Sequence, residues 1–182
     1  GFIFSLLLTF QGVPATLSTG PTAQVLEQST EVKTQHIPLG PVAPMVAIKQ
    51  LGSNGGGWYG PNSSVPLENP TPLSNVIEMI AILLIPLSAV FMVGRFIQRK
   101  KLMWMIFGSM LLMSLSSTLL TLWAEKSSLT PNTALMEGKE VRFGADASAL
   151  WGSLTTQVNN GSVNMMHDSA SPLTGLVELC NM

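Results

Sequence analysis

The sequence has few charged residues and a single cysteine, and both features exclude certain classes of protein. Only 10% of its 182 residues are charged, whereas charged residues make up about a quarter of a soluble domain, so an ordinary soluble domain is excluded. The net charge of −1 provides no basic surface for nucleic acid or anionic lipid. The lone Cys180 excludes an internal disulfide, and its apolar surroundings predict a small buried side chain rather than a reactive thiol.

Motifs for nucleotide and metal chemistry are also scarce. The sequence contains neither a P-loop Gly-Lys-Ser/Thr nor an Asp-Lys-Thr-Gly phosphorylation sequence, so no motif for ATP hydrolysis is recognisable. His36 and His167 lie far apart, without Cys or His neighbours at metal-ligand spacing. Residues 55–60 match a Gly-x-Gly-x-x-Gly dinucleotide pattern, but a proline-rich stretch follows where that site needs a helix. We therefore reject a nucleotide site.

Long apolar segments are what the sequence does have. Asn75–Ile97 and Leu102–Trp123 each supply about twenty apolar positions, enough to cross a bilayer core of roughly 30 Å. Between them, residues 98–101 read Gln-Arg-Lys-Lys, and the positive-inside rule places this basic turn in the cytoplasm. The two spans thus predict a membrane hairpin, with the polar segments on either side of it facing outward.

The first residues read as the interior of another apolar span. Gly1 is not a start methionine, and we expect an outward-running span from Gly1 to about Leu17. A further span would begin at Gly175. We interpret the chain as an internal fragment of a longer membrane protein.

A pattern of nine residues occurs twice and indicates internal repeats. Residues 71–79 read Thr-Pro-Leu-Ser-Asn-Val-Ile-Glu-Met, and residues 171–179 read Ser-Pro-Leu-Thr-Gly-Leu-Val-Glu-Leu. An Asn-Gly loop precedes each copy, at Asn54-Gly55 and at Asn160-Gly161.

Each loop follows a segment that favours a helix but is too short to cross a membrane. These segments are residues 41–50, with proline in the first turn, and residues 147–157, with Asp146 as the N-cap. The predicted fold class is therefore an all-α polytopic membrane protein built from repeats of transmembrane helix, re-entrant pore helix with filter loop, and transmembrane helix.

The composition of both loops points to a monovalent cation. Residues 51–57 are rich in glycine and residues 158–164 in small polar side chains, so the backbone can approach a ligand closely. Carbonyls of a re-entrant loop that lines a wet cavity can replace the hydration shell of such an ion. Neither loop core contains a carboxylate, which disfavours Ca²⁺ and Mg²⁺. Ordinary extracellular turns are the alternative, and the equivalent positions of the two loops favour a filter.

The sequence does not decide the roles of four ionisable residues near the loops. Glu78 and Glu178 occupy the same position in both repeats, where a carboxylate either offsets the helix dipole or serves a function. His167, followed by Asp168, is expected to brace the second loop by hydrogen bonds. A membrane enzyme that uses His167 and Asp168 is a remote alternative.

Several segments of the sequence resemble the KdpA family, the potassium-binding subunits of bacterial potassium pumps. They are Gln11–Val13, Gly40–Ala43, Gly55–Ser63, Glu68–Asn75, Glu137–Gly144 and Asn160–Ser169. Gly60-Pro61 departs from that pattern and leaves the outer vestibule undefined.

The resemblance implies a fold of four membrane–pore-loop–membrane repeats in the wider potassium-transporter superfamily. Residues 1–97 would be the end of the outer helix, the pore loop and the second helix of repeat two. Residues 98–101 would be a cytoplasmic loop, and residues 102–182 the corresponding part of repeat three up to its second helix. It further implies a multi-pass protein of the bacterial inner membrane, with a P-type ATPase catalytic subunit and small accessory subunits as partners.

The function that follows is potassium binding and translocation for an ATP-driven uptake complex, with no catalysis by this chain. The K⁺ ion would be held by backbone carbonyls of both loops. The candidate site residues are Ser53, Asn54, Gly55, Gly56, Asn159, Asn160, Gly161 and Ser162. A passive channel or an ion-coupled symporter of the same architecture is the alternative.

Overall fold

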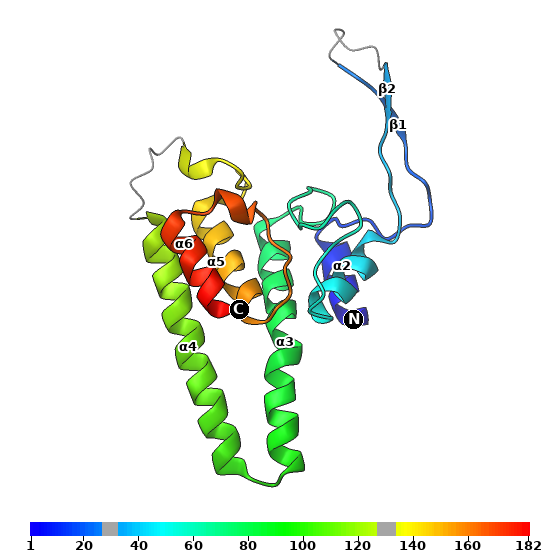
Figure 1. Ribbon diagram of the computed structural model, residues 1–182. Coiled ribbons are helices and arrows are strands. Elements are labelled where there is room, and N and C mark those ends of the chain that lie inside the picture. Colours follow the sequence, from blue (N-terminus) through cyan, green and yellow to red (C-terminus); the bar gives the residue numbers. More distant parts are fainter. Residues whose placement is uncertain (27–32, 127–133) are drawn as a thin grey trace.

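The computed structural model describes residues 1–26, 33–126 and 134–182, and it is mostly helical. The helices are α1 (Phe2–Phe10), α2 (Val42–Leu51), α3 (Pro72–Phe96), α4 (Lys100–Lys126), α5 (Gly144–Gln157) and α6 (Pro172–Asn181). Two 3₁₀ turns, η1 (Ala134–Met136) and η2 (His167–Ser169), flank α5. The strands β1 (Thr22–Gln24) and β2 (Thr34–His36) pair antiparallel in a hairpin that projects from the helical body (Figure 1). This polar hairpin is a departure from the predicted all-α fold. Its strands have no alternation of apolar and polar residues from which they could have been predicted.

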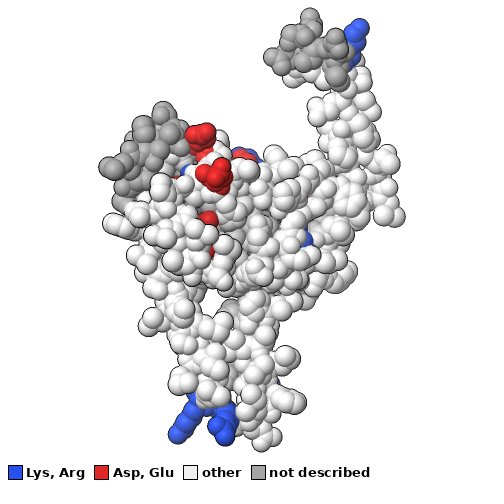
Figure 2. Space-filling view, viewed as in Figure 1, with Lys and Arg blue, Asp and Glu red and all other residues white. Residues whose placement is uncertain are grey.

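The two long helices form the predicted hairpin and are candidate membrane spans. Both α3 and α4 are long and apolar enough to cross a membrane, and most of their side chains are not covered by the described chain. They run side by side and join at a short turn (Figure 1). Basic side chains gather at that turn (Figure 2), where Arg95, Arg99, Lys100 and Lys101 are all exposed.

The repeated sequence forms the same helix start twice. Thr71 caps α3 by accepting a hydrogen bond from the Ser74 N–H at 3.0 Å, and Ser171 caps α6 from the Thr174 N–H at 3.2 Å. In both helices a proline follows the cap, at a first-turn position that needs no backbone donor.

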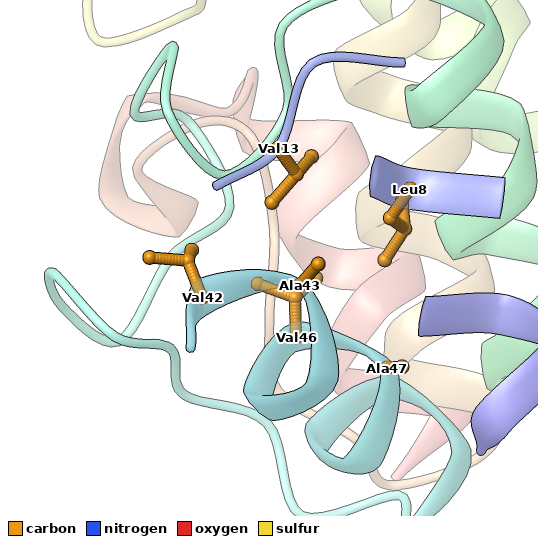
Figure 3. Close-up of a cluster of buried hydrophobic side chains, with 6 residues drawn as sticks. All are labelled: Leu8, Val13, Val42, Ala43, Val46 and Ala47. Carbon is orange, nitrogen blue, oxygen red and sulfur yellow. The ribbon is translucent and has the colours of Figure 1, made fainter. Parts of the chain in front are cut away.

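The two short helices lie beside the ends of α3 and α4 that are remote from the basic turn (Figure 1). One apolar cluster packs α2 against α1 and the residues after it, through Leu8, Val13, Val42, Ala43, Val46 and Ala47 (Figure 3). A second cluster surrounds Trp151 of α5 with Met79 and Ile82 of α3 and with Val163 and Met165. The second short helix, α5, therefore packs against α3, the long helix of the first repeat.

Three local predictions were wrong. The first helix ends at Phe10 instead of near Leu17, because Gly12 turns the chain with a φ of 99° and Pro14 follows. The cap of α5 is Phe143, and Asp146 lies within its first turn, where it pairs with Lys126. Cys180 is exposed in the described chain, whereas its apolar surroundings in the sequence predicted burial.

Candidate functional site

The two glycine loops share an uncommon backbone conformation. In the first loop Ser53 and Gly55 have φ values of 53° and 62°, and in the second loop Asn159 and Gly161 have 58° and 84°. Left-handed backbone is rare for residues other than glycine, so its presence at Ser53 and Asn159 is distinctive. Each loop follows the carboxyl end of a short helix, α2 or α5. The two repeats thus present the same loop.

The structure brings the two loops into contact. A methyl group placed on Gly55 would lie 2.4 Å from the carbonyl oxygen of Asn160 and 3.1 Å from the backbone nitrogen of Ser162. The Asn160 side-chain amide donates to the carbonyls of Lys49 and Gln50, at 3.3 Å and 3.4 Å. Residues separated by more than half of the chain therefore form one site.

The backbone carbonyls of both loops are available to a ligand. In the described part of the chain, no backbone N–H donates to a carbonyl of residues 53–56 or 159–162. Buried carbonyls are nearly always paired in folded proteins, so the carbonyls of the two buried residues, Asn160 and Ser162, need a partner other than a backbone N–H. The His167 ring supplies a hydrogen bond to the carbonyl of Gly161.

Of the candidate residues, Asn160 and Ser162 are buried, whereas Asn159 and Gly161 are exposed in the described chain. Gly55 is the point of contact with the second loop, and Ser53, Asn54 and Gly56 lie on the same turn. Metal ligands of another kind are absent: across residues 1–26, 33–126 and 134–182, no three His, Cys, Asp or Glu side chains form a group that could hold a metal ion. The dinucleotide pattern at residues 55–60 follows helix α2 and not a strand, which rules out its function.

Gln50 contacts residues of both loops, and the sequence did not identify it as a site residue. Its side chain is completely buried in the last turn of α2. The Nε2 atom donates to Ser63 Oγ at 3.0 Å and to Glu78 Oε2 at 2.7 Å, and Oε1 accepts from Ser162 Oγ at 2.8 Å. A glutamine in the last turn of an otherwise mostly apolar short helix was the only sequence signal.

The two repeated glutamates hold different partners. Glu78 of α3 is 1% exposed and accepts the hydrogen bond from Gln50 of the first pore helix. Glu178 of α6 lies 2.8 Å from Nδ1 of His167, which confirms the expected brace of the second loop. Each glutamate thus secures the segment around the loop of its own repeat.

The contact with Glu178 changes the protonation of His167. The hydrogen bond from Glu178 raises the pKa of His167 above its usual value, and the hydrogen bond with Gly161 adds to this, whereas partial burial opposes it. A protonated His167 is therefore favoured, with one hydrogen bond to a carboxylate and another to a carbonyl of the second loop.

A buried ion pair supports the chain that leaves the first loop. Lys49 Nζ lies 3.3 Å from Glu68 Oε2, and both side chains are almost fully covered. The other oxygen of Glu68 accepts from the N–H groups of Trp58 and Tyr59. A methyl group on Gly57 would lie 2.3 Å from Lys49 Nζ. A larger residue at this position would therefore displace the ends of the Lys49 and Glu68 side chains.

A second clamp reaches from one repeat to the other. The guanidinium of Arg142 donates to the carbonyls of Ser64 and Asn69, both at 2.8 Å, and its Nε donates to Glu140. Burial alone would raise the pKa of Glu140, but the hydrogen bonds from Arg142 lower it.

Two apolar helices of membrane-spanning length and two loops of the same backbone conformation define a mostly helical protein with two candidate membrane spans. The family comparison is more specific. The family model of the potassium-transporting ATPase A subunit, KdpA, matches residues 1–182, and the chain belongs to this family of membrane transporter subunits.

Curated relatives agree with the family model. The chain is 46% identical to the potassium-transporting ATPase potassium-binding subunit of Leptospira interrogans over 184 residues, with all of this chain covered. The subunits of the same name from Pseudomonas putida and Pseudomonas aeruginosa are 44% and 46% identical, with 99% of this chain covered. In each case the match covers 32% of the relative, so the chain spans about a third of the length of these proteins.

Proposed function

We propose that this chain forms part of a potassium-binding and translocating subunit, in which the two glycine loops are filter segments for K⁺. The observation that carries the proposal is the pair of equivalent loops in contact, whose carbonyls accept no backbone hydrogen bond in the described residues. The ion would be held by carbonyls of residues 53–56 facing those of residues 159–162. The names of the relatives support K⁺ as the cargo.

The chemistry of the loops favours a weakly hydrated monovalent cation. Carbonyl dipoles offer partial negative charge without a full carboxylate, which suits K⁺ better than Ca²⁺ or Mg²⁺. The carboxyl ends of α2 and α5 lead into the loops, and the negative ends of their dipoles favour a cation there.

The proposed architecture has four membrane–pore-loop–membrane repeats, of which this chain contributes parts of the second and third. Residues 1–97 and 102–182 would be the two repeats, and residues 98–101 the cytoplasmic turn between them. Two further repeats would complete a ring of carbonyls. The exposed basic turn supports a cytoplasmic position, which puts the filter loops on the outer side of the bacterial inner membrane.

In this proposal the chain is a non-catalytic part of an ATP-driven complex. A separate P-type ATPase subunit would hydrolyse ATP, and small accessory subunits would complete the assembly. The name of the family, an ATPase A subunit, favours this over a passive channel or an ion-coupled symporter. Uptake that requires the co-expressed ATPase subunit distinguishes the two, because a channel or symporter would work without it.

Potassium-limited growth of an uptake-deficient bacterium tests the site. The complete protein that contains this chain would be expressed with its partner subunits, as wild type, Gly55→Ala or Gly60→Ala. Gly60 is a matched control because a methyl group there meets no atom within 4 Å. We expect Gly55→Ala to need far more K⁺ than the wild type, and Gly60→Ala to grow as the wild type does. Equal growth of all three would overturn the filter assignment.

A further inference from the structure

The buried side chain of Gln50 joins the last turn of α2 to α3 and to the second loop. Its three polar contacts come from three different parts of the chain: Ser63, Glu78 of α3, and Ser162 of the second loop. All four side chains have an exposure of 1% or less. A carboxamide has two donor hydrogens and an acceptor oxygen, and here the donors face Ser63 and Glu78 and the acceptor faces Ser162. The orientation of the amide is thereby fixed.

The contact with Ser162 reaches the backbone of the second loop. The Ser162 hydroxyl lies 2.8 Å from Gln50 Oε1 and 2.6 Å from Asn160 Oδ1. The single hydroxyl proton can be donated to only one of these two oxygens at a time, so Gln50 and Asn160 share Ser162 as a donor, and Asn160 Oδ1 also accepts from the Ser162 N–H at 3.1 Å. The backbone carbonyl of Gln50 accepts from the Asn160 amide as well. One residue of the first pore helix therefore holds two neighbouring residues of the second loop.

Among the described residues, the second repeat shows no corresponding bridge between the loops. Thr156 occupies the position in α5 that Gln50 has in α2, and its hydroxyl donates to the Gly152 carbonyl of its own helix at 2.9 Å. Glu178, the counterpart of Glu78, contacts His167 instead of the pore helix. At this helix position, the side chain of the first repeat contacts the other loop, and the side chain of the second repeat does not in the described chain.

We propose that Gln50 is a positioning residue that acts through Ser162 and Asn160 to set the spacing of the two loops, and through it the discrimination among monovalent cations. The inference rests on the proposed function of the loops as a potassium filter. A filter distinguishes ions by the size and stiffness of its carbonyl cage. A buried hydrogen-bonded network stiffens that cage, and loss of Gln50 removes one donor from the buried carboxyl of Glu78, whose Oε1 already lacks a hydrogen-bond partner in the described chain.

Cation competition in the complete transporter tests this role. We would measure K⁺ uptake and its inhibition by Rb⁺ and Na⁺ for the wild type, Gln50→Met and Gln157→Met, all expressed with the partner subunits and compared at equal assembly. Methionine keeps the length of glutamine and removes its hydrogen bonds. Gln157 is the matched control, because its carboxamide ends the other pore helix but contacts Ser114, Thr118 and Ser153 and neither loop.

Gln50→Met is expected to lower the preference for K⁺ over the competing ions by about tenfold, on the order of the net contribution of one buried hydrogen bond. Gln157→Met is expected to keep the wild-type preference. An unchanged preference in an assembled Gln50→Met transporter, or an equal loss in both variants, would overturn the inference. A wild type that does not prefer K⁺ would overturn the proposed function itself.

An exchange of the two partners keeps the test decisive if Gln50→Met fails to assemble. In the double variant Gln50→Glu with Glu78→Gln, the amide and the carboxylate trade places and the acceptor for Ser162 remains. We expect Gln50→Glu alone to lose selectivity, because two carboxylates would face each other, and the double variant to regain it. A double variant that assembles without regaining selectivity contradicts the role of Gln50.

Discussion

At the scale of single residues, Gly55 and Gly161 have the same backbone conformation but different surroundings. Both have positive φ, which costs an L-residue roughly 1–2 kcal/mol. A methyl group on Gly55 would also collide with the carbonyl of Asn160, whereas one on Gly161 would meet no atom of the described chain within 4 Å. The space between the loops is therefore closed at Gly55 and open at Gly161.

This difference predicts unequal effects of the same substitution. Gly55→Ala should raise the K⁺ concentration for half-maximal uptake by much more than Gly161→Ala, because only the former pushes the loops apart. The measurement is the concentration dependence of uptake by the complete transporter in each variant. Equal effects of the two substitutions would show that backbone strain alone is responsible.

His167 predicts a pH dependence of stability. Its pKa in the folded protein is raised by Glu178, so the stabilisation is fully present below the ordinary value of 6.5 and is lost as pH rises through the raised value. The wild-type complex should therefore lose more thermal stability than His167→Gln between about pH 6 and pH 9. His36→Gln, in the exposed strand β2, is the control and should follow the wild type. Parallel pH profiles of wild type and His167→Gln would refute this account of the brace.

At the scale of elements, two ion pairs hold the second repeat around α4, and they differ in burial. Lys139 Nζ lies 2.9 Å from Glu125 Oε1 of α4 with both side chains covered, and it also donates to the Ser169 carbonyl. The same glutamate accepts hydrogen bonds from Ser171 and Thr174 at the start of α6. The pair therefore fixes where α6 begins relative to α4. Lys126 and Asp146 form the other pair, 3.1 Å apart and more than half exposed.

These pairs should respond differently to loss of the lysine. Lys139→Met should lower the free energy of unfolding by about 3–5 kcal/mol, because Glu125 is left charged and buried without its partner. Lys126→Met, in the exposed pair, should cost less than about 1 kcal/mol. Thermal unfolding of the purified complex compares them. A Lys139→Met complex as stable as Lys126→Met would show that Glu125 finds another partner.

The elements that sequence could predict are those whose signals are local. The spans α3 and α4 follow from uninterrupted apolar runs, their connection from four basic residues, and the starts of α3 and α6 from a Ser/Thr-Pro pair. The short helix α2 was predicted to within a residue at each end. The cap of α5 was not predicted correctly, because Asp146 fits a capping pattern but lies within the first turn, where its carboxylate pairs with Lys126.

The contacts that sequence could not predict join residues of different repeats. Gln50 and Ser162, or Arg142 and Ser64, meet only because the short helices α2 and α5 both pack against α3, and no periodicity in the sequence predicts that packing. The position of the loops was predictable from glycine and asparagine, but not which residue lies between them. The ion pair of Lys49 and Glu68 could not be predicted either, because it depends on the path of an irregular segment of the chain.

At the scale of the whole molecule, the basic turn lies at one end of the helical hairpin, and the short helices α2 and α5 that lead into the loops lie beside its other half (Figures 1 and 2). The described chain leaves much of α3 and α4 uncovered, as expected where lipid or other repeats pack against them. Two of the four proposed filter segments are present here. The central claim is thus about the place where the ion is bound.

The most direct test is the location of the ion in the complete complex. Rb⁺ replaces K⁺ in such a site and scatters X-rays anomalously, so its position can be measured in crystals of the wild-type complex. We predict an anomalous peak bounded by carbonyl oxygens of residues 53–56 on one side and of residues 159–162 on the other. A peak away from both loops, with those carbonyls hydrogen-bonded to protein, would contradict the account.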